Sequence, residues 1–474
     1  MSFTADISRQ GEYVYLRQNN TVLCGTAGKE TTVCSSERIR TGFYFLSEDE
    51  FMSGTILIKN IRAVDAVKDT VTDVFISDGI IAGVGNITAV NADTVIDGTG
   101  LVLMPSLFDM HVHFRDPGFT HKEDILTGCS AALAGGVTGV LAMPNTNPPC
   151  DNPETVRYIT EKAQGTGVDV YPVGCITGGM KGNGLNDYEA LKKAGCICIS
   201  DDGRPVENAE MMRRALELSN ENGLLVASHC EDLAIINGGI MNKGEISAKL
   251  GVKGMDRASE DYITAREIIL ASSVNARIHI CHVSTEGSTA VIRFAKSRGI
   301  KVTCETAPHY FMLTDRLLEK RDADYRMNPP LRTDKDVRAI IDGIKDGTID
   351  CIITDHAPHT AEEKAVFEKA PNGVVGLETS FAAALTALYH TGKVSLNRIA
   401  ELMCVNPRKI LGLEIPAVEV GKTADLMIAD IGRKWTVDPE KLHSKSHNTV
   451  FKGMTLTGKP LVTISKGIIR YDER

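Results

Sequence analysis

The sequence predicts an α/β fold: a (β/α)8 TIM-type barrel with a small composite β-sandwich that both flanks of the barrel build together. Short apolar, β-branched runs alternate with helix-like segments through the middle of the chain, and eight such units fit into about 300 residues. Strands that alternate with helices pair in parallel through right-handed crossovers. On either side of this region the sequence reads as short strands joined by turns, which indicates small flanking sheets.

Eight apolar runs are the expected barrel strands, at residues 101–114, 137–144, 168–176, 195–200, 224–228, 276–283, 301–306 and 349–354. The segments between them, such as 205–222, 259–273 and 286–298, carry apolar residues at helical spacing. Several of these segments end near Gly or Asn, as helices commonly do. A doubly wound open sheet is the alternative, but it would place a glycine-rich phosphate loop after the first strand, where this chain has His-Val-His-Phe-Arg-Asp-Pro-Gly.

We expect four segments along the chain of 474 residues. Residues 1–53 are an N-terminal extension whose role the sequence does not reveal, and residues 54–104 are the first part of the β-sandwich. Residues 105–415 are the barrel, and residues 416–474 are the second part of the sandwich. Barrels of about 250 residues commonly count as one domain, so this length agrees with a single barrel and its flanks.

The composition excludes several classes of protein. The chain is 43% hydrophobic and 24% charged, as soluble domains are, and its formal net charge of -9 argues against a nucleic-acid partner. No apolar run reaches the roughly 18 to 20 residues that cross a membrane, and the start of the chain lacks a secretion signal. The 12 cysteines include no CxxC pair, so we expect reduced thiols and a cytoplasmic protein.

Metal-capable side chains recur where the expected strands end. His111 and His113 stand two apart in the first strand, so their side chains point to the same face. The strand ends of a barrel meet at one rim, which would bring this pair to His229, His282 and Asp355 from other strands. Imidazole and carboxylate groups are ligands of zinc and similar ions. Together these residues predict a metal site, which a lone His-x-His pair would not.

Two acidic residues have further candidate roles. Asp355 can hold a metal, take a proton from an activated water and return it to a leaving group; the alternative is an N-cap or salt-bridge residue. Asp202 follows the fourth strand, where related barrels bridge two ions with a carboxylated lysine. The nearest lysines, Lys192 and Lys193, precede that strand, so the Asp202 carboxylate is the candidate bridge. An Asp-Gly turn is its other interpretation.

A candidate carboxylate-binding pair stands beside the metal residues. Arg115 lies two residues past His113 on the same face, and its planar guanidinium can hold a carboxylate bidentately. Asn145, at the end of the neighbouring strand, can add amide hydrogen bonds to the same group. A rim salt bridge and a turn are the structural alternatives for these two residues. The Pro-containing loops 327–332 and 357–360 can reach over the site.

Several motifs occur in an order that identifies a family. They are DMHVHFRDPG at 109–118, MPNTNP at 143–148, SDDG at 200–203, SHCE at 228–231, CHVST at 281–285, MNPPLR at 327–332, TDHAPHT at 354–360 and GLET at 376–379. From about residue 54 to its end the chain resembles the dihydroorotases of the amidohydrolase superfamily, and the SDDG motif is similar to the bacterial monofunctional type. Two departures are Ser106, where the family usually has Gly, and Asn372, where an aromatic residue is common.

This resemblance implies a site with two zinc ions. His111, His113 and Asp355 would hold one ion, His229 and His282 the other, and Asp202 would bridge them. The resemblance also implies that Arg115, Asn145 and Asn328 bind substrate and that His359 contacts the pyrimidine ring.

The activity implied by the resemblance is the reversible cyclisation of N-carbamoyl-L-aspartate to L-dihydroorotate in de novo pyrimidine (UMP) biosynthesis. Water activated by zinc would attack the ring amide, with Asp355 as general acid and base. Two alternatives stay open: another cyclic amidase, acting on hydantoins or allantoin, and a scaffold homologue without activity. A homodimer and association with aspartate carbamoyltransferase are hypotheses that the sequence does not decide.

Overall fold

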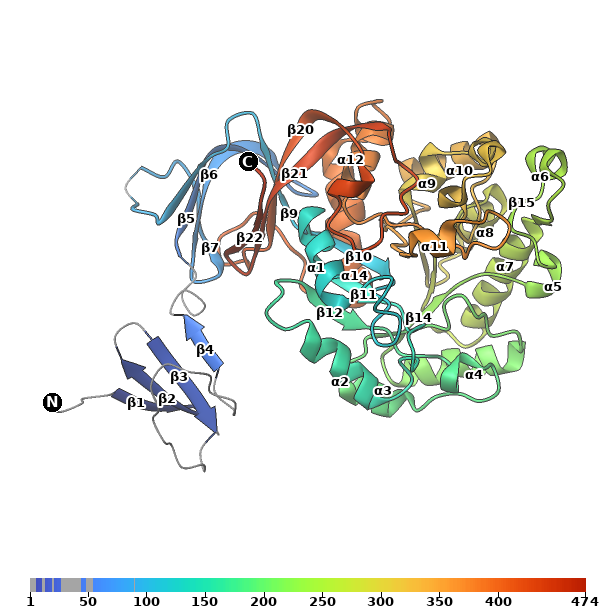
Figure 1. Cartoon of the computed structure of the whole chain (residues 1–474), viewed down its shortest axis with the longest axis horizontal. Helices are drawn as coiled ribbons and strands as arrows, with labels where there is room; N and C mark the ends of the chain where they lie inside the picture. Colours follow the sequence, from blue (N-terminus) through green and yellow to red (C-terminus); the bar gives the residue numbers. More distant parts are fainter. Residues whose placement is uncertain (1–5, 11–12, 19–20, 27–43, 48–53, 89) are drawn as a thin grey trace.

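The computed structural model describes residues 6–10, 13–18, 21–26, 44–47, 54–88 and 90–474 (Figure 1). The first 53 residues contain four short strands, which pair as an antiparallel sheet in chain order: β1 (Asp6–Gln10), β2 (Tyr13–Gln18), β3 (Thr21–Thr26) and β4 (Tyr44–Ser47). The expected N-terminal extension therefore has a sheet of its own, and its role stays open.

Eight parallel strands form the barrel, and each lies within one of the eight predicted runs. They are β10 (Leu107–Val112), β11 (Val137–Ala142), β12 (Asp169–Pro172), β13 (Cys198–Ile199), β14 (Leu225–Ser228), β17 (Ile278–Ile280), β18 (Val302–Thr306) and β19 (Cys351–Ile352). Strands β10 to β12 form one sheet and the other five form a second. Parallel bridges between Gly174 and Ile199, and between Val112 and His356, join the two sheets at both edges. The predicted barrel architecture is thus confirmed.

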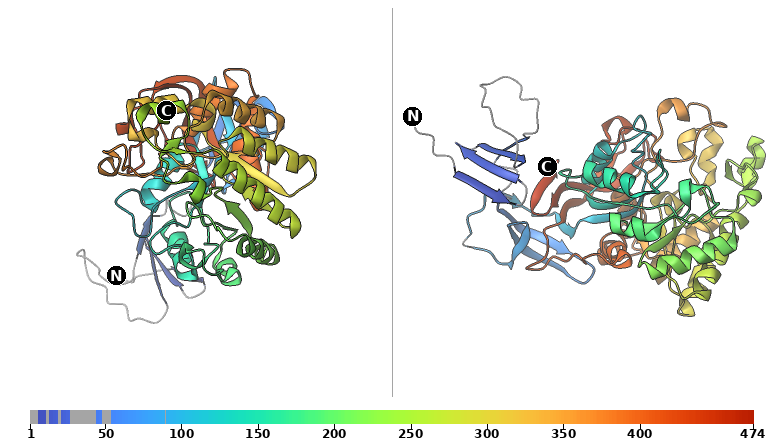
Figure 2. Two further views of the ribbon diagram at one scale, coloured as in Figure 1. Left: turned by 90° about the vertical axis from the view of Figure 1, so that its right-hand side faces the viewer. Right: turned by 90° about the horizontal axis from the view of Figure 1, so that it is seen from below.

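Helices lie around the outside of these strands (Figure 2). The longer ones are α1 (Ile125–Ala134), α2 (Pro153–Lys162), α3 (Tyr188–Ala194), α4 (Ala209–Glu221), α7 (Ala258–Ser273), α8 (Glu286–Ser297) and α10 (Asp334–Asp346). Shorter ones are α5 (Leu233–Ile236), α6 (Glu245–Leu250), α9 (Pro308–Met312), α11 (Ala361–Lys364), α12 (Ser380–Ala384), α13 (Leu396–Ala400) and α14 (Asn406–Leu411). The pair β15 (Met241–Asn242) and β16 (Gly254–Met255) lies between α5 and α7. The segments predicted as helices around α4, α7 and α8 are confirmed.

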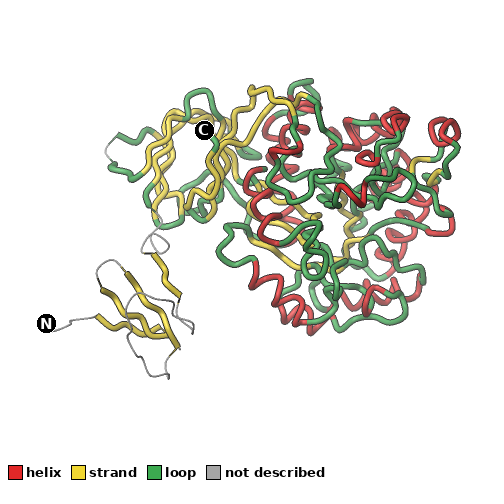
Figure 3. Tube along the Cα trace, in the orientation of Figure 1, coloured by secondary structure: helices red, strands yellow, loops and turns green. Residues whose placement is uncertain are grey.

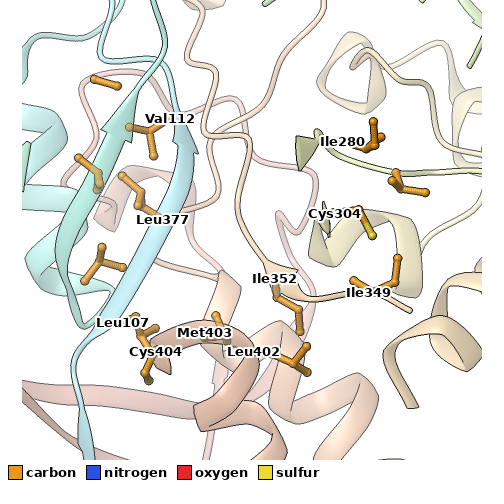
Figure 4. Close-up of a cluster of buried hydrophobic side chains, with 14 of the residues drawn as sticks. Leu107, Val112, Ile280, Cys304, Ile349, Ile352, Leu377, Leu402, Met403 and Cys404 are labelled. Atoms are coloured by element: carbon orange, nitrogen blue, oxygen red, sulfur yellow. The ribbon is translucent and has the colours of Figure 1, made fainter. Parts of the chain in front are cut away.

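The barrel strands are buried on both faces, as parallel strands usually are. In β14, Leu225 and Ala227 belong to one apolar cluster and Val226 belongs to the other. Figure 4 shows part of the cluster that contains Val226, where Ile352 lies near Leu402 and Leu107 lies near Cys404 of the helical turn Glu401–Val405. Fully burying one such side chain contributes about 1.5–3 kcal/mol. This double packing holds the strand ends, and so the site at them, in fixed positions.

The two flanks join in one eight-stranded sheet. The first flank supplies β5 (Ile56–Val64), β6 (Asp69–Ser77), β7 (Ile80–Gly85), β8 (Thr94–Asp97) and β9 (Val102–Pro105), and the second supplies β20 (Leu426–Thr436), β21 (Thr455–Ser465) and β22 (Ile468–Asp472). Strand β9 pairs antiparallel with β20, which joins the flanks, and Figure 3 shows this strand-rich part beside the helix-rich barrel. The prediction that both flanks build one unit is confirmed.

One expected strand is in fact two. The run 101–114 divides into β9, in the composite sheet, and β10, in the barrel. Between them the amide of Ser106 donates to the carbonyl of Asp425 (3.0 Å), whereas the amide of Leu107 donates to Gly136 (2.9 Å). The partner changes there because the chain leaves one sheet for the other, so the prediction of a single strand was wrong. No helix in the described part of the chain is long and apolar enough to cross a membrane.

Candidate active site

The Asp202 carboxylate lies at the centre of a cluster of four imidazoles. Its Oδ1 is 3.4 Å from Nε2 of His111, 3.5 Å from Nδ1 of His229 and 3.6 Å from Nε2 of His282. Its other oxygen, Oδ2, is 3.5 Å from Nε2 of His113. All five side chains are buried. The structure therefore brings together residues that follow or end strands β10, β13, β14 and β17.

Asp355 lies on one side of this cluster. Its Oδ1 is 3.2 Å from Nε2 of His113 and 3.8 Å from Nε2 of His111. On the other side, Nδ1 of His229 and Nε2 of His282 are 2.9 Å apart. The cluster thus contains two donor groups that share Asp202, one with His111 and His113 and one with the second histidine pair.

The donor set fits a divalent metal. Within the described residues, three buried polar atoms of the cluster have no hydrogen-bond partner: Nε2 of His111, Oδ1 of Asp202 and Nδ1 of His282. Unpartnered buried polar atoms are rare, and an ion is one explanation for them. Imidazole nitrogen and carboxylate oxygen are the ligands that zinc takes in catalytic sites. The chemistry of these residues therefore fits a metal site.

Hydrogen bonds on the far ring nitrogens orient the first two histidines. Nδ1 of His111 is 2.8 Å from Oε1 of Glu305, and Nδ1 of His113 is 2.8 Å from Oδ1 of Asn145. Each bond makes Nδ1 the donor and leaves Nε2 free to face Asp202. Burial raises the pKa of Glu305, but hydrogen bonds from His111 and His279 outweigh it and hold that pKa well below its usual value. Glu305 therefore stays charged under these rings.

Three site residues have a left-handed backbone that side-chain-bearing residues seldom adopt. The φ angles are 60° at Arg115, 33° at His282 and 48° at Asp355. Such a conformation costs on the order of 1–3 kcal/mol and clusters at functional sites. Each of the three lies just beyond a barrel strand, where the change of direction aims the side chain across the rim. The surrounding packing therefore holds these three residues in a backbone conformation that is unfavourable by itself.

A cavity of about 270 Å³ opens beside the metal cluster. Its lining includes the four residues predicted to bind substrate and also residues that the sequence did not single out; the full set is His113, Arg115, Asn145, Asp202, Gly203, His229, His282, Asn328, Asp355, Ala357, His359, Asn372 and Gly373. His111 lies behind this lining and is completely buried. All ten predicted site residues therefore lie in or directly behind one cavity wall.

Arg115 is the cation of this cavity. Its Nε donates to the carbonyl of Pro358 (3.3 Å), and its guanidinium lies 3.3 Å from Nε2 of His359. Among the described residues no carboxylate lies within 4.0 Å of this guanidinium, so its charge is available to an anion. Burial lowers the pKa of Arg115 to about 10, which still leaves it charged at neutral pH.

Asn328 and His359 face the same cavity from two loops. The amide nitrogen Nδ2 of Asn328 donates to Oε1 of Glu231 (2.8 Å). Burial, followed by the charges of Arg115 and Lys122, lowers the pKa of His359 to about 3, so its ring is neutral. Nε2 of His359 also lies 3.0 Å from the carbonyl oxygen of Asn372. A neutral ring in this position offers a hydrogen bond without adding charge beside Arg115.

Several residues of the site were missed by sequence reasoning. Glu305 had a signal, because a single acidic residue stood in the apolar run 301–306. Gly203 and Ala357 lie in the SDDG motif and in the loop 357–360 but were not assigned roles of their own, and Gly373 had no signal. His279 is buried as well, and its Nε2 lies 3.1 Å from Oε2 of Glu305, the carboxylate whose other oxygen contacts His111.

Comparison with known proteins shows which family the chain belongs to. A family model described as Dihydro-orotase-like matches residues 100–288. A protein named dihydroorotase from Citrifermentans bemidjiense is 48% identical over 421 residues, which are 88% of this chain and 99% of the relative. Another of that name, from Acetivibrio thermocellus, is 46% identical over 423 residues, again 88% of this chain and 99% of the relative. The chain belongs to the dihydroorotase family.

Solved structures outside the family share its fold. The L-hydantoinase (dihydropyrimidinase) of Arthrobacter aurescens superposes with a TM-score of 0.78 at 26% identity, covering 88% of this chain and 96% of that one. The dihydropyrimidinase of Brevibacillus agri gives a TM-score of 0.79 at 24% identity, covering 88% and 95%. Proteins named hydantoinase and dihydropyrimidinase therefore share the fold of this chain.

Proposed function

We propose that this protein catalyses the reversible cyclisation of N-carbamoyl-L-aspartate to L-dihydroorotate, a step of de novo pyrimidine biosynthesis. Membership of the dihydroorotase family makes it a cyclic amide hydrolase. One observation carries the choice of substrate: the Arg115 guanidinium, which has no carboxylate partner among the described residues, shares a cavity with the metal cluster. Both proposed substrates carry a carboxylate that a planar guanidinium can hold.

The proposed metal is zinc, with two ions per subunit. His111, His113 and Asp355 would hold one ion, His229 and His282 the other, and Asp202 would bridge them. This division follows the two donor groups that share Asp202. When bound, zinc supplies Lewis-acid chemistry, polarising a carbonyl and lowering the pKa of water from 15.7 to about 7.

The side chains of the cavity supply binding and proton transfer. Arg115 would hold the substrate carboxylate, with Asn145 and Asn328 offering amide groups and His359 meeting the ring. Fixing the ring at one end sets its amide carbonyl against the metal cluster, which is a positional contribution to the rate. Asp355 would act as general base toward the attacking water and as general acid toward the departing ring nitrogen. Its position supports this role, because its Oδ1 lies beside the cluster, 3.2 Å from Nε2 of His113.

Hydantoinase or allantoinase activity is the rival within the same chemistry. Hydantoin lacks the carboxylate that Arg115 would hold, so a panel of dihydroorotate, hydantoin and allantoin separates the two. We expect the highest kcat/KM on dihydroorotate, and faster hydrolysis of hydantoin or allantoin would overturn the proposal. A scaffold without activity is the rival from another class; zinc-free native protein without cyclisation activity would favour it.

Three further proposals concern the protein's surroundings. A cytoplasmic location is supported by the ten cysteines of residues 54–474, all of which are free and buried. We also propose that the protein forms a homodimer and that it associates with aspartate carbamoyltransferase. Size-exclusion chromatography with light scattering, alone and with aspartate carbamoyltransferase added, tests both.

A further inference from the structure

Lys364, the last residue of α11, is a buried lysine that forms no ion pair within the described residues. Its side chain is 7% exposed. Its Nζ donates to three backbone carbonyls, those of Arg326 (3.1 Å), Pro371 (3.0 Å) and Gly373 (3.0 Å). An ammonium has three donors, so this arrangement uses all of them.

The three carbonyls belong to two loops of the cavity wall. Arg326 stands two residues before Asn328, and Gly373 itself lines the cavity. The amide of Gly373 donates to the carbonyl of Arg326 (3.0 Å), so the two loops also contact each other directly. Lys364 lies under this junction and ties both loops to α11, which begins just after His359.

The backbone of Gly373 lies directly against Ala357 and the His359 ring. Its φ is 142°, and a Cβ there would lie 2.5 Å from the carbonyl oxygen of Ala357 and 3.0 Å from the His359 ring. Only glycine allows the backbone to approach that closely. A shift of the Gly373 backbone would therefore move directly against His359, one of the residues proposed to contact substrate.

Keeping an ammonium at this place has a cost that a stability role would not require. Burial lowers the pKa of Lys364 to about 7, which reflects the loss of water around the charge. Taking an ammonium out of water costs free energy that its hydrogen bonds must offset. Two of the three carbonyls would keep another donor without Lys364, since Gly373 also accepts from Asn448 (3.0 Å) and Arg326 accepts from Gly373.

We propose that Lys364 is a positioning residue for substrate binding: by joining the carbonyls of Arg326, Pro371 and Gly373 it holds the wall formed by Asn328, His359 and Gly373 in its binding shape. This inference rests on the proposed function only for the identity of the substrate. The metal cluster draws its ligands from other elements, so the metal centre is independent of Lys364.

Lys364→Met removes the ammonium and keeps an unbranched side chain. We expect KM for dihydroorotate to rise at least tenfold, kcat to change less than threefold, and zinc per chain to stay at the wild-type value. Lys364→Gln keeps two amide donors and should give an intermediate KM; it carries the same test if the methionine variant does not fold. Lys296→Met is the control, because Lys296 is partly buried and bonds Asp350 and Gly347 away from the cavity.

Hydrogen exchange of the substrate-free enzymes gives a second readout that does not depend on turnover. Peptides covering 326–332 and 370–376 should exchange faster in Lys364→Met than in the wild type or Lys296→Met. Unchanged KM together with unchanged exchange would overturn the proposal, as would loss of zinc or of cooperative unfolding in both Lys364 variants. Wild-type protein that does not turn over dihydroorotate would instead overturn the proposed function, and the exchange experiment would still decide the role of Lys364.

Discussion

Glu305 and His111 form a buried pair across the barrel, with Oε1 of the carboxylate 2.8 Å from Nδ1 of the ring. Strand β18 supplies one residue and β10 the other. The bond fixes which ring nitrogen faces Asp202, so the geometry of the metal cluster depends on a residue that does not belong to it.

Replacing Glu305 by Gln should weaken metal binding. The amide cannot offer the negative charge that holds the Nδ1 proton of His111, and changes of this kind typically cost about 10–100-fold in metal affinity. Competition with a chromophoric chelator measures that affinity. Glu267→Gln is a suitable control, since Glu267 is also buried but contacts Arg266 on α7. Equal zinc affinities in the two variants would refute the orienting role.

Arg115→Met should discriminate between substrates by their carboxylate. Charge-assisted hydrogen bonds contribute about 1.5–3 kcal/mol, which corresponds to roughly a 10- to 150-fold loss in kcat/KM on dihydroorotate. Dihydrouracil, which has the same ring without the carboxylate, should lose little. Steady-state kinetics of the variant on both substrates checks this, and an equal loss on both would show that Arg115 shapes the cavity rather than binding the carboxylate.

Much of the fold and of the metal cluster could be predicted because both follow from local patterns. The alternation of apolar runs with helical segments located all eight barrel strands, and the spacing of His111 and His113 placed both at one rim. The run 101–114 reads as one strand, since an unbroken apolar run does not reveal that its two halves pair with different sheets, although the expected boundary between flank and barrel at residues 104 and 105 lies beside the observed division.

Contacts between segments distant in the sequence could not be predicted either. Glu305 and His111 are 194 residues apart in sequence, and no periodicity links them. The wall around Gly373 depends on two loops that Lys364 joins through their backbone carbonyls, for which side-chain identity carries little information. Sequence patterns thus located the residues of the metal cluster, whereas the supporting contacts required the folded chain.

Metal removal should reduce both activity and stability. The buried imidazoles and carboxylates gather around Asp202, so ions that bind only the folded state stabilise it, by about 2.7 kcal/mol at a hundred times Kd. Dialysis against a chelator should abolish turnover and lower Tm, and adding back two equivalents of zinc should restore both. Full recovery with one equivalent would contradict the proposed pair of ions.

The pair of His443 and Glu378 predicts a pH-dependent contribution to stability. The hydrogen bond that Nδ1 of His443 donates to the Glu378 carboxylate (2.8 Å) raises the pKa of His443 above its usual value, against a smaller lowering by burial. Its folded pKa therefore lies above the unfolded value of about 6.5. The stabilisation is fully present below about pH 6.5 and is lost as the pH rises through the folded pKa.

Urea unfolding of the wild type and His443→Gln at several pH values tests this linkage. The side chain of His443 is 40% exposed, so solvent screening limits the difference in unfolding free energy to about 1 kcal/mol at most. The backbone amide of His443 still donates to Glu378 in the variant, which isolates the side chain. A difference that does not shrink between pH 6 and pH 9 would exclude the charge on His443 as its source.

Asp355→Asn should separate proton transfer from metal binding. The amide oxygen can still face His113 and the metal, whereas asparagine cannot accept the proton of the attacking water. We expect kcat to fall by about 10²–10⁴-fold in both directions of the reaction, with the fold preserved. Zinc analysis and circular dichroism of the same sample are needed, because a parallel loss of metal would explain the defect without proton transfer. Retained zinc with a wild-type kcat would remove Asp355 from its role as general acid and base, and the neutral His359 (3.3 Å from Arg115) would be the next candidate within the cavity.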